Sequence, residues 1–296
     1  VGAAPAPPAP IAKTSPTTVA GSAQTGSRNF TSTGATKVLA TPAVRALAKE
    51  RGLDLANVTG SGPGGSVTRA DLETAAVSNR EPEDGEVVEP LRGVRRAMDA
   101  NMSAAHRVVV PTTVTDEADI GDWMPGTDVT ARLVRAIGVA CTAEPALNSS
   151  YLGRDRGRVV HRTVDLGVAV DTPDGLFVPV IRNCASLAAE QLRAELQRLK
   201  DGVRARSLAP AELRNPTISL SNFGVFAGRH ANLVVVPPQV AIIGAGRVRE
   251  APVALRGTVV VSRLLPVSIT FDHRVVMGGE TTRFLRALLD DLQLPD

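Results

Sequence analysis

Apolar and polar positions alternate near the C-terminus and then change to a helical spacing. Val267, Ile269 and Phe271 alternate with polar residues, which predicts the end of a strand. After the Gly pair at 278–279, apolar residues recur three and four positions apart, the spacing of an amphipathic helix. The pattern therefore places His273 in a turn between a strand end and a helix start, where the scaffold holds a side chain that stays accessible.

Further strands and helices precede this pair, and the composition becomes that of a globular domain at about Pro90. The patterns predict a helix within 91–102, a strand over 108–114, a helix over 129–143, a hairpin of strands 164–170 and 176–181, and strands over 217–221 and 237–244. This mixture of elements predicts an α/β (α+β) domain over residues 90–296.

A small helical unit is expected over residues 38–76. Thr41 can cap a helix that has Pro42 at its first position, and Gly52 can end it. Thr68 and Asp71 resemble a capping box at the start of a second helix. Such a unit is near the lower size limit for independent folding.

Two stretches have the composition of linkers. Residues 1–37 are rich in Ala, Pro, Ser, Thr and Gly and contain few large apolar side chains, which predicts a flexible linker. Residues 77–89 are polar and acidic and contain Pro82 and Gly85, so we expect a second linker there. The predicted order is therefore linker 1–37, small unit 38–76, linker 77–89 and main domain 90–296.

Charge and cysteine content narrow the classes of function. The formal net charge of +3 gives no indication of nucleic-acid binding, and no apolar run is long enough to cross a membrane. Cys141 and Cys184 belong to no metal or redox motif. We expect both to be reduced, packed thiols in a cytoplasmic protein, and nothing near residue 1 resembles a signal peptide.

The run from Phe271 to Val276 followed by Gly278 resembles the signature of a known enzyme family. Its sequence, Phe-Asp-His-Arg-Val-Val, is similar to that of the dihydrolipoamide acyltransferase component of 2-oxo acid dehydrogenase complexes. The resemblance extends from about Val38 to Leu294 through several matched blocks in the same order. It implies a chloramphenicol-acetyltransferase-like catalytic domain with a mixed sheet, preceded by a small helical subunit-binding domain.

The resemblance also implies an activity and its residues. The reaction is acyl transfer between a dihydrolipoyl thioester and coenzyme A. His273 matches the base that removes the thiol proton, and Ser221 matches the hydroxyl that stabilises charge on the thioester oxygen. Arg274 and Asn222 occupy supporting positions beside them. In the family the serine and histidine meet across the interface of a homotrimer, and trimers build a larger core.

Met277 stands where the family usually has an Asp that holds the histidine turn by a contact with an Arg. A thioether cannot accept a charge-assisted hydrogen bond of that kind. Glu280 is the nearest carboxylate in the sequence beyond this point, and it can substitute if the helix starts early. The family's charged helix before 129–143 is also replaced by the short segment 121–126, which we expect the core to tolerate.

Residues 38–76 are similar to the family's peripheral subunit-binding domain. In that domain an Arg of the first helix contacts acidic residues of dihydrolipoamide dehydrogenase or of the 2-oxo acid decarboxylase, and Arg45 matches it. The lipoyl group is expected on a domain that is not present in this chain, because no folded segment with a modifiable Lys precedes the first linker.

Three hypotheses remain open at this point. The chain is an acyltransferase, a non-catalytic scaffold subunit of such a complex, or a stand-alone enzyme of the chloramphenicol acetyltransferase type. Simpler interpretations also exist for the single residues. His273 can be a structural turn residue, Ser221 can bond its own backbone, and Arg45 can belong to a solvated helix face.

Overall fold

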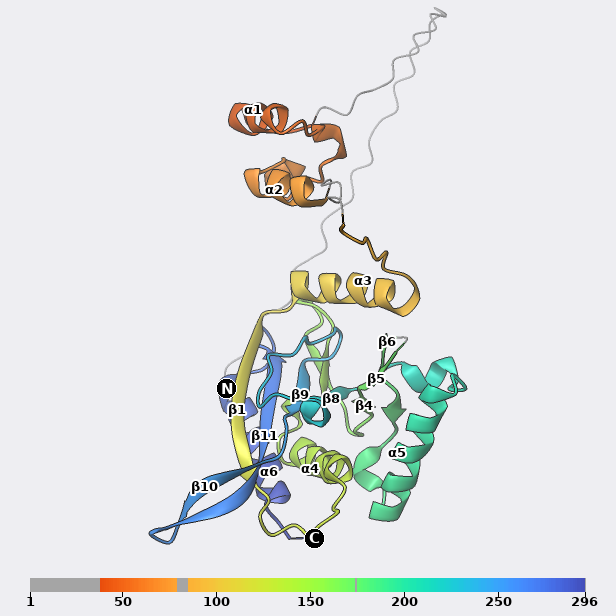
Figure 1. Ribbon diagram of the computed structural model, residues 1–296, viewed down its shortest axis with the longest axis vertical. Coiled ribbons are helices and arrows are strands. Elements are labelled where there is room, and N and C mark those ends of the chain that lie inside the picture. Colours follow the sequence, from red (N-terminus) through yellow and green to blue (C-terminus); the bar gives the residue numbers. More distant parts are fainter. Residues whose placement is uncertain (1–37, 79–84, 174, 296) are drawn as a thin grey trace, which may run out of the picture. The chain divides into compact units, whose positions relative to one another are not determined.

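The computed structural model describes residues 38–78, 85–173 and 175–295, and the chain divides into two compact units at Val88 and Glu89 (Figure 1). The predicted linker over residues 1–37 lies outside the described residues, as does the part of the second linker over residues 79–84. Each unit is described by itself.

The first unit contains two helices, α1 (Pro42–Glu50) and α2 (Arg69–Ser78), as the capping residues predict. The Thr41 hydroxyl accepts the Val44 N–H at 3.4 Å, and two short 3₁₀ turns, Leu55–Asn57 and Pro63–Gly65, join the helices. Thr68 and Asp71 form the expected box, because each side chain accepts the other's backbone N–H. A small core of Val44, Ala48, Val67 and Leu72 holds the unit together.

The second unit is built on a mixed sheet with the strand order β1-β11-β9-β8-β4-β7, while β10 pairs with β11. Strands β4, β8 and β9 run parallel to one another, and β11 is antiparallel to β9 and β1. The sheet strands are β1 (Pro111–Asp119), β4 (Leu166–Val168), β7 (Val180–Ile181), β8 (Ile218–Asn222), β9 (Ala241–Ala245), β10 (Arg249–Leu255) and β11 (Thr258–Asp272). The helices are α3 (Gly93–Val108), α4 (Val129–Ala143), α5 (Ala189–Arg204) and α6 (Gly278–Leu292).

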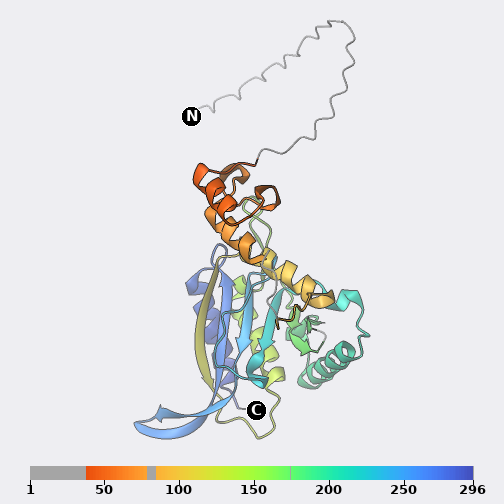
Figure 2. The same ribbon diagram turned by 45° about the horizontal axis from the view of Figure 1, so that its top comes forward.

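The alternation along β11 separates the two faces of this sheet. Ile269 and its apolar neighbours share one buried core with α4, α5 and α6, and α4 also packs on α6 (Figures 1 and 2). The hydroxyls of Ser268 and Thr270 are buried on the other face, where they accept the backbone N–H groups of Ala231 and Leu233. The polar positions therefore hold an irregular segment over the second face of the sheet.

The predicted hairpin over residues 164–181 is broken into two pieces. β4 and β7 pair within the main sheet, whereas β5 (Val170–Thr172) and β6 (Gly175–Phe177) form a separate two-stranded sheet. The pairing of the hairpin is interrupted at Ala169, whose N–H continues the parallel ladder of β4 with β8 by donating to the Leu220 carbonyl. A second small hairpin, which the sequence patterns did not indicate, joins β2 (Ser149–Tyr151) to β3 (Arg158–Val160). The predicted start of the first strand at residue 108 is also wrong, because α3 extends to Val108.

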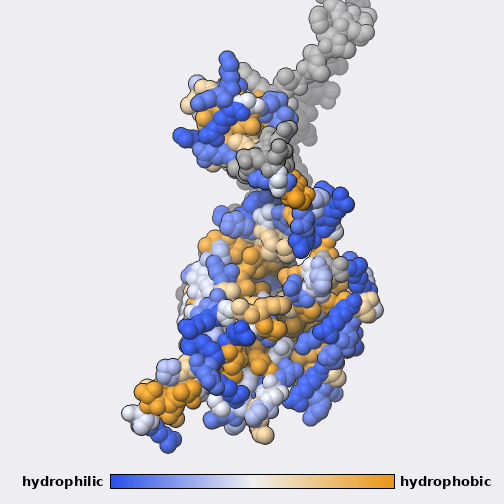
Figure 3. Space-filling view, viewed as in Figure 1, coloured by the Kyte–Doolittle hydropathy of each residue, from blue (hydrophilic) through white to orange (hydrophobic). Residues whose placement is uncertain are grey.

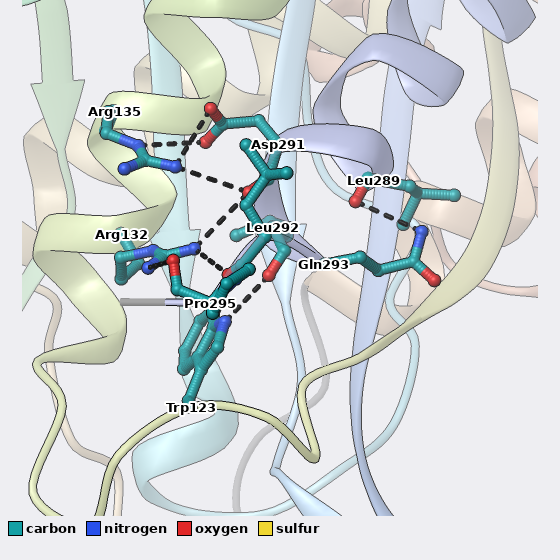
Figure 4. Close-up of polar contacts among 9 residues, drawn as sticks. Trp123, Arg132, Arg135, Leu289, Asp291, Leu292, Gln293 and Pro295 are labelled. Carbon is teal, nitrogen blue, oxygen red and sulfur yellow. Dashed lines mark hydrogen bonds and ion pairs between the residues drawn. The ribbon is translucent and has the colours of Figure 1, made fainter.

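The short segment before α4 is anchored by Trp123. Its indole N–H donates to the Leu292 carbonyl at 2.7 Å, and the Arg132 guanidinium lies over the indole ring at 4.8 Å (Figure 4). Arg135 of α4 forms an ion pair with Asp291 of α6 at 3.0 Å. The two helices are thus joined at this end of the core. The core accommodates the short segment 121–126, as expected.

Both cysteines are buried and unpaired, as expected for packed thiols. Burial raises the pKa of Cys184 to about 12, and it also raises the pKa of Cys141. Such thiols remain protonated and unreactive at neutral pH. Among the helices that the structure describes, none combines the length and apolar character that a membrane crossing requires.

Candidate active site

Ser221 lies at the end of β8 and faces a cleft. Ile218 and Leu220 are fully buried, so the alternation of the strand turns Ser219 and Ser221 to the opposite face. Ser221 lines a cleft of about 620 Å³ between that face and α3, which we call the Ser221 cleft. Among the described residues its hydroxyl has no hydrogen-bond partner. The simpler interpretation of a serine bonded to its own backbone therefore has no support in this geometry.

A glutamine that the sequence patterns did not single out shares this cleft. The Ser219 hydroxyl donates to Gln239 Oε1 at 2.8 Å, and both residues line the Ser221 cleft. Gln239 follows the cis bond between Pro237 and Pro238 and lies two residues before the start of β9 at Ala241. Because its amide oxygen is engaged by Ser219, its NH₂ group remains as a neutral donor.

Asn222 follows Ser221 but has a different environment. Its amide donates to the Thr130 hydroxyl at 3.2 Å, and Thr130 lies in the first turn of α4. The residue does not line the Ser221 cleft. We conclude that Asn222 fixes the end of β8 to α4 and that it supports Ser221 only indirectly.

His273 follows β11, in the turn that precedes α6. Its backbone N–H donates to the Val110 carbonyl at 2.9 Å, and its side chain is exposed. The Phe271 ring lies 5.4 Å from the imidazole between centroids. The predicted location between a strand end and a helix start is confirmed, with the backbone fixed and the imidazole accessible.

The neighbours of His273 form an ion pair whose carboxylate is buried and whose guanidinium is partly exposed. The Asp272 carboxylate accepts both Nε and a terminal nitrogen of Arg274, the latter at 2.6 Å, and also the Val110 N–H. Burial by itself opposes the charge, but the bonds from Arg274 and Val110 outweigh it and lower the pKa of Asp272. The Arg274 guanidinium also lies over the Tyr151 ring at 5.0 Å. Arg274 thus supports the turn rather than offering an unengaged charge.

Glu280 lies in the first turn of α6, as expected for a helix that starts early. α6 begins at Gly278, and the Glu280 carboxylate accepts the Met277 N–H at 2.7 Å. It also forms an ion pair with Arg158 of β3 at 2.9 Å, while Arg158 donates to the Val275 carbonyl at 3.0 Å. Burial by itself raises the pKa of Glu280. The bonds from Arg158 and Met277 lower it by more than burial raises it, so the net shift of the pKa is downward. The Met277 side chain is 65% exposed and makes no capping bond.

Ser221 and His273 do not meet within one chain. Ser221 pairs with Gly244 of β9, and Gly244 pairs with Ser268 of β11. His273 lies five residues beyond Ser268, about 17 Å along the strand, and two strand spacings, about 10 Å, lie across the sheet. One copy of the chain therefore presents two halves of a site at separate places.

Arg45 of the first unit contacts its own chain. Its guanidinium donates to the carbonyl groups of Val38 and Ala40 at 2.6 and 3.2 Å. The side chain remains exposed, so these bonds hold the segment before α1 and leave one side of the group open. The described residues contain no cluster of His, Cys, Asp or Glu suited to a metal ion.

Comparison with known proteins covers both units. Residues 83–296 match the family model of the 2-oxoacid dehydrogenases acyltransferase (catalytic domain), and residues 38–73 match the e3 binding domain. The dihydrolipoyllysine-residue acetyltransferase component of the acetoin cleaving system of Bacillus subtilis is 31% identical over 86% of this chain and 69% of its own length. The chain spans 60 to 66% of the length of several other curated relatives.

Solved structures give the same result for the fold. The dihydrolipoamide acetyltransferase of Azotobacter vinelandii is 28% identical with a TM-score of 0.67, covering 72% of this chain and 96% of that one. The cubic core of a pyruvate dehydrogenase multienzyme complex is 29% identical with the same TM-score and the same coverage. The expected fold class, a mixed-sheet acyltransferase domain preceded in sequence by a helical binding domain, is confirmed. The chain belongs to the 2-oxoacid dehydrogenase acyltransferase family.

Proposed function

We propose that this chain transfers acyl groups between a dihydrolipoyl thioester and coenzyme A within a 2-oxo acid dehydrogenase complex. His273 acts as the base and Ser221 as the hydrogen-bond donor to the thioester oxygen. The observation that carries the proposal is the pair itself, an accessible imidazole at a fixed turn and an unengaged hydroxyl in a cleft, on a chain of this family.

The spacing of these residues supports the assignment. The Azotobacter vinelandii structure was determined to investigate the role of a serine, a histidine and an asparagine in the catalytic mechanism of that enzyme. There the serine precedes the histidine by 52 positions and the asparagine follows it by four. Ser221 precedes His273 by the same 52 positions, and Met277 follows by four. Two of the three side chains are thus matched in type.

The proposed chemistry needs no covalent enzyme intermediate. His273 takes the proton from the thiol of coenzyme A, and the thiolate attacks the carbonyl carbon of the dihydrolipoyl thioester. The negative charge that forms on the carbonyl oxygen accepts a hydrogen bond from Ser221 Oγ. When the intermediate collapses, the carbon–sulfur bond to the dihydrolipoyl group breaks, and its thiolate takes the proton back from His273.

Because the two halves lie apart in one chain, the proposal requires assembly. We infer that Ser221 of one copy faces His273 of a neighbouring copy in a homotrimer, and that trimers associate into a larger core, as the cubic core structure suggests. The projecting β10–β11 hairpin supports association, because Leu255, Val259 and Val261 are more than half exposed on it (lower left in Figure 3). Contiguous exposed apolar groups of this kind mark association surfaces.

The first unit binds the partner protein in this proposal. An e3 binding domain binds the dehydrogenase component of such complexes, and we propose dihydrolipoamide dehydrogenase, or the 2-oxo acid decarboxylase, as the protein that it captures through Arg45. We also place the protein in the cytoplasm, which the two buried thiols support. The predicted boundaries at residues 37, 76 and 89 belong to this proposal as well.

Met277 favours one second candidate, a scaffold subunit that has lost turnover, because a thioether replaces a hydrogen-bonding side chain. An assay with free dihydrolipoamide and acetyl-coenzyme A separates the two. Formation of acetyl-dihydrolipoamide by the assembled protein supports the enzyme, and its absence supports the scaffold. Transfer to chloramphenicol instead of dihydrolipoamide would contradict both the acyltransferase and the scaffold candidates. It would favour the stand-alone enzyme, which the match to the e3 binding domain disfavours.

A further inference from the structure

The Ser221 cleft is lined only by uncharged side chains among the described residues. Its polar groups are the amides and hydroxyls of Asn101, Asn215, Ser219, Ser221 and Gln239. The other lining residues are all apolar, and Met98 of α3 is one of them. Such walls suit apolar groups and neutral carbonyl oxygens, and they offer no counter-ion to a bound charge.

The half of the site around His273 adds no unengaged cation from the residues beside the turn. Arg274 is bonded through two nitrogens to Asp272 and covers Tyr151. Arg158 is paired with Glu280. A ligand carboxylate would therefore meet guanidinium groups whose charge is already balanced by an internal carboxylate, and it would gain less from them than from an unpaired cation.

The position of Ser221 fixes where an acyl chain must lie. If Ser221 donates to the thioester oxygen, the chain beyond the carbonyl carbon extends from that point into the surrounding cleft. In a succinyl group the carboxylate lies three carbon–carbon bonds further on, roughly 4 Å away. It would then rest against the uncharged walls without a counter-ion, where a charge is costly.

We propose, on the basis of the function proposed above, that the Ser221 cleft selects uncharged acyl groups, straight or branched, and discriminates against acyl groups that carry a second carboxylate. The substrate class is therefore the thioesters of monocarboxylic acids. The neutral donors Gln239 and Ser221 serve carbonyl oxygens, and the discrimination comes from the desolvation of the charge rather than from size.

A matched pair of substrates tests the proposal. 4-Methylpentanoyl-coenzyme A has the same branched shape as succinyl-coenzyme A but carries two methyl groups in place of the carboxylate oxygens. With dihydrolipoamide as acceptor and the assembled protein, we expect kcat/KM for succinyl-coenzyme A to be about 100-fold lower than for 4-methylpentanoyl-coenzyme A. Equal or better use of succinyl-coenzyme A would overturn the proposal. If acetyl-coenzyme A and both other thioesters are inert, the proposed acyl transfer itself fails, and the selectivity fails with it.

A cation placed in the cleft provides a second measurement. Met98 lies on α3, lines the cleft and is 43% exposed, so Met98→Lys adds a flexible charge without opening the core. We expect it to raise the ratio of succinyl to 4-methylpentanoyl turnover about tenfold. Met124→Lys, at an exposed methionine outside the cleft, is the matched control and should leave the ratio unchanged. An unchanged ratio in Met98→Lys would place the acyl chain outside this cleft.

Discussion

The imidazole of His273 is exposed while its backbone is fixed by Val110, which suits a group that must meet a thiol arriving from outside the chain. Because a general base contributes a factor of 100 or more, we expect His273→Ala to lower turnover of dihydrolipoamide and acetyl-coenzyme A at least ~100-fold. Steady-state rates on the assembled variant measure this. An undiminished rate in a folded, assembled variant would remove His273 from the mechanism.

Ser221 differs from its neighbour Ser219 in having no partner among the described residues, whereas Ser219 is bonded to Gln239. A donor to developing charge acts in the transition state, so we expect Ser221→Ala to lower kcat about 100-fold with little change in KM. Ser219→Ala is the matched control within the same cleft, and we expect a smaller effect from it. A change confined to KM in Ser221→Ala would indicate that the hydroxyl only positions the substrate.

Residues within the signature could be predicted from the sequence, but their partners could not. His273, Arg274 and Glu280 lie within eight positions of one another, so one motif places them. Arg158 precedes Glu280 by 122 positions and sits on a hairpin too short to give a pattern. Gln239 is joined to Ser219 by a tertiary contact over 20 positions. Contacts of this kind follow from the fold, which a local pattern does not contain.

At the level of elements, the start of α6 shows how the turn is held without an Asp at position 277. Glu280 caps the Met277 N–H and binds Arg158, and Arg158 also holds the Val275 carbonyl. This clamp joins helix α6 to strand β3 directly after the His273 turn. Glu280 thus supplies a carboxylate in the first turn of α6, three residues after a position whose side chain offers none.

We therefore expect Glu280→Gln to lower kcat about tenfold, because loss of the ion pair loosens the turn that carries His273. Loss of a charged hydrogen-bond partner should also reduce the free energy of unfolding by about 1–3 kcal/mol. Arg158→Gln should give the same loss of kcat, and the double variant should be little worse than either single variant. Initial rates and denaturant titrations measure these effects. Full activity in Glu280→Gln would show that the clamp does not position His273.

Met277→Asp is the companion variant. If the absent carboxylate limits the site, this change raises turnover; since Glu280 already holds Arg158 and the Met277 N–H, we expect a change of less than about threefold. Steady-state kcat compared with the unaltered chain gives the answer. A large gain would mean that Glu280 is an incomplete substitute and that the chain works below the capacity of its fold.

Elements with a long and simple pattern were predicted best. Helix α4 spans the predicted residues 129–143 because its apolar face continues over four turns and Asp128 caps it. The 164–181 hairpin was predicted as one pair of strands, yet its pairing is interrupted near Ala169 into β4–β7 and β5–β6. The alternation of apolar and polar residues indicates the two faces of a strand, but it does not say where the pairing with a neighbour is interrupted.

At the level of the whole molecule, partner binding by the first unit can be tested independently of acyl transfer. Arg45→Glu should weaken capture of dihydrolipoamide dehydrogenase, with an effect that shrinks at high salt, and leave acyl transfer intact. Binding titrations at two salt concentrations, alongside the acyl transfer assay, test this. Lys49→Glu on the same helix controls for the change of charge alone. Equal affinity of wild type and Arg45→Glu at low salt would assign Arg45 only to its bonds with Val38 and Ala40.

The separation of Ser221 and His273 leads to the most direct test of the assembled site. In a ring of three identical chains each site would take its serine from one copy and its histidine from the next. Ser221→Ala and His273→Ala are each inactive in this scheme for different reasons. In a trimer that contains both variants, one interface brings an intact Ser221 against an intact His273.

We therefore expect activity to return when the two inactive variants are unfolded together and reassembled. Random mixing in equal amounts should give about a quarter of the wild-type rate, since about three quarters of the trimers contain both variants and each of these has one intact site. The rate of acetyl-dihydrolipoamide formation by the mixture, against each variant reassembled alone, is the measurement. Wild type that is unfolded and reassembled in the same way controls for the activity lost during reassembly. A mixture as inactive as its components, with mixed trimers demonstrated by mass, would show that the two residues do not act together across an interface.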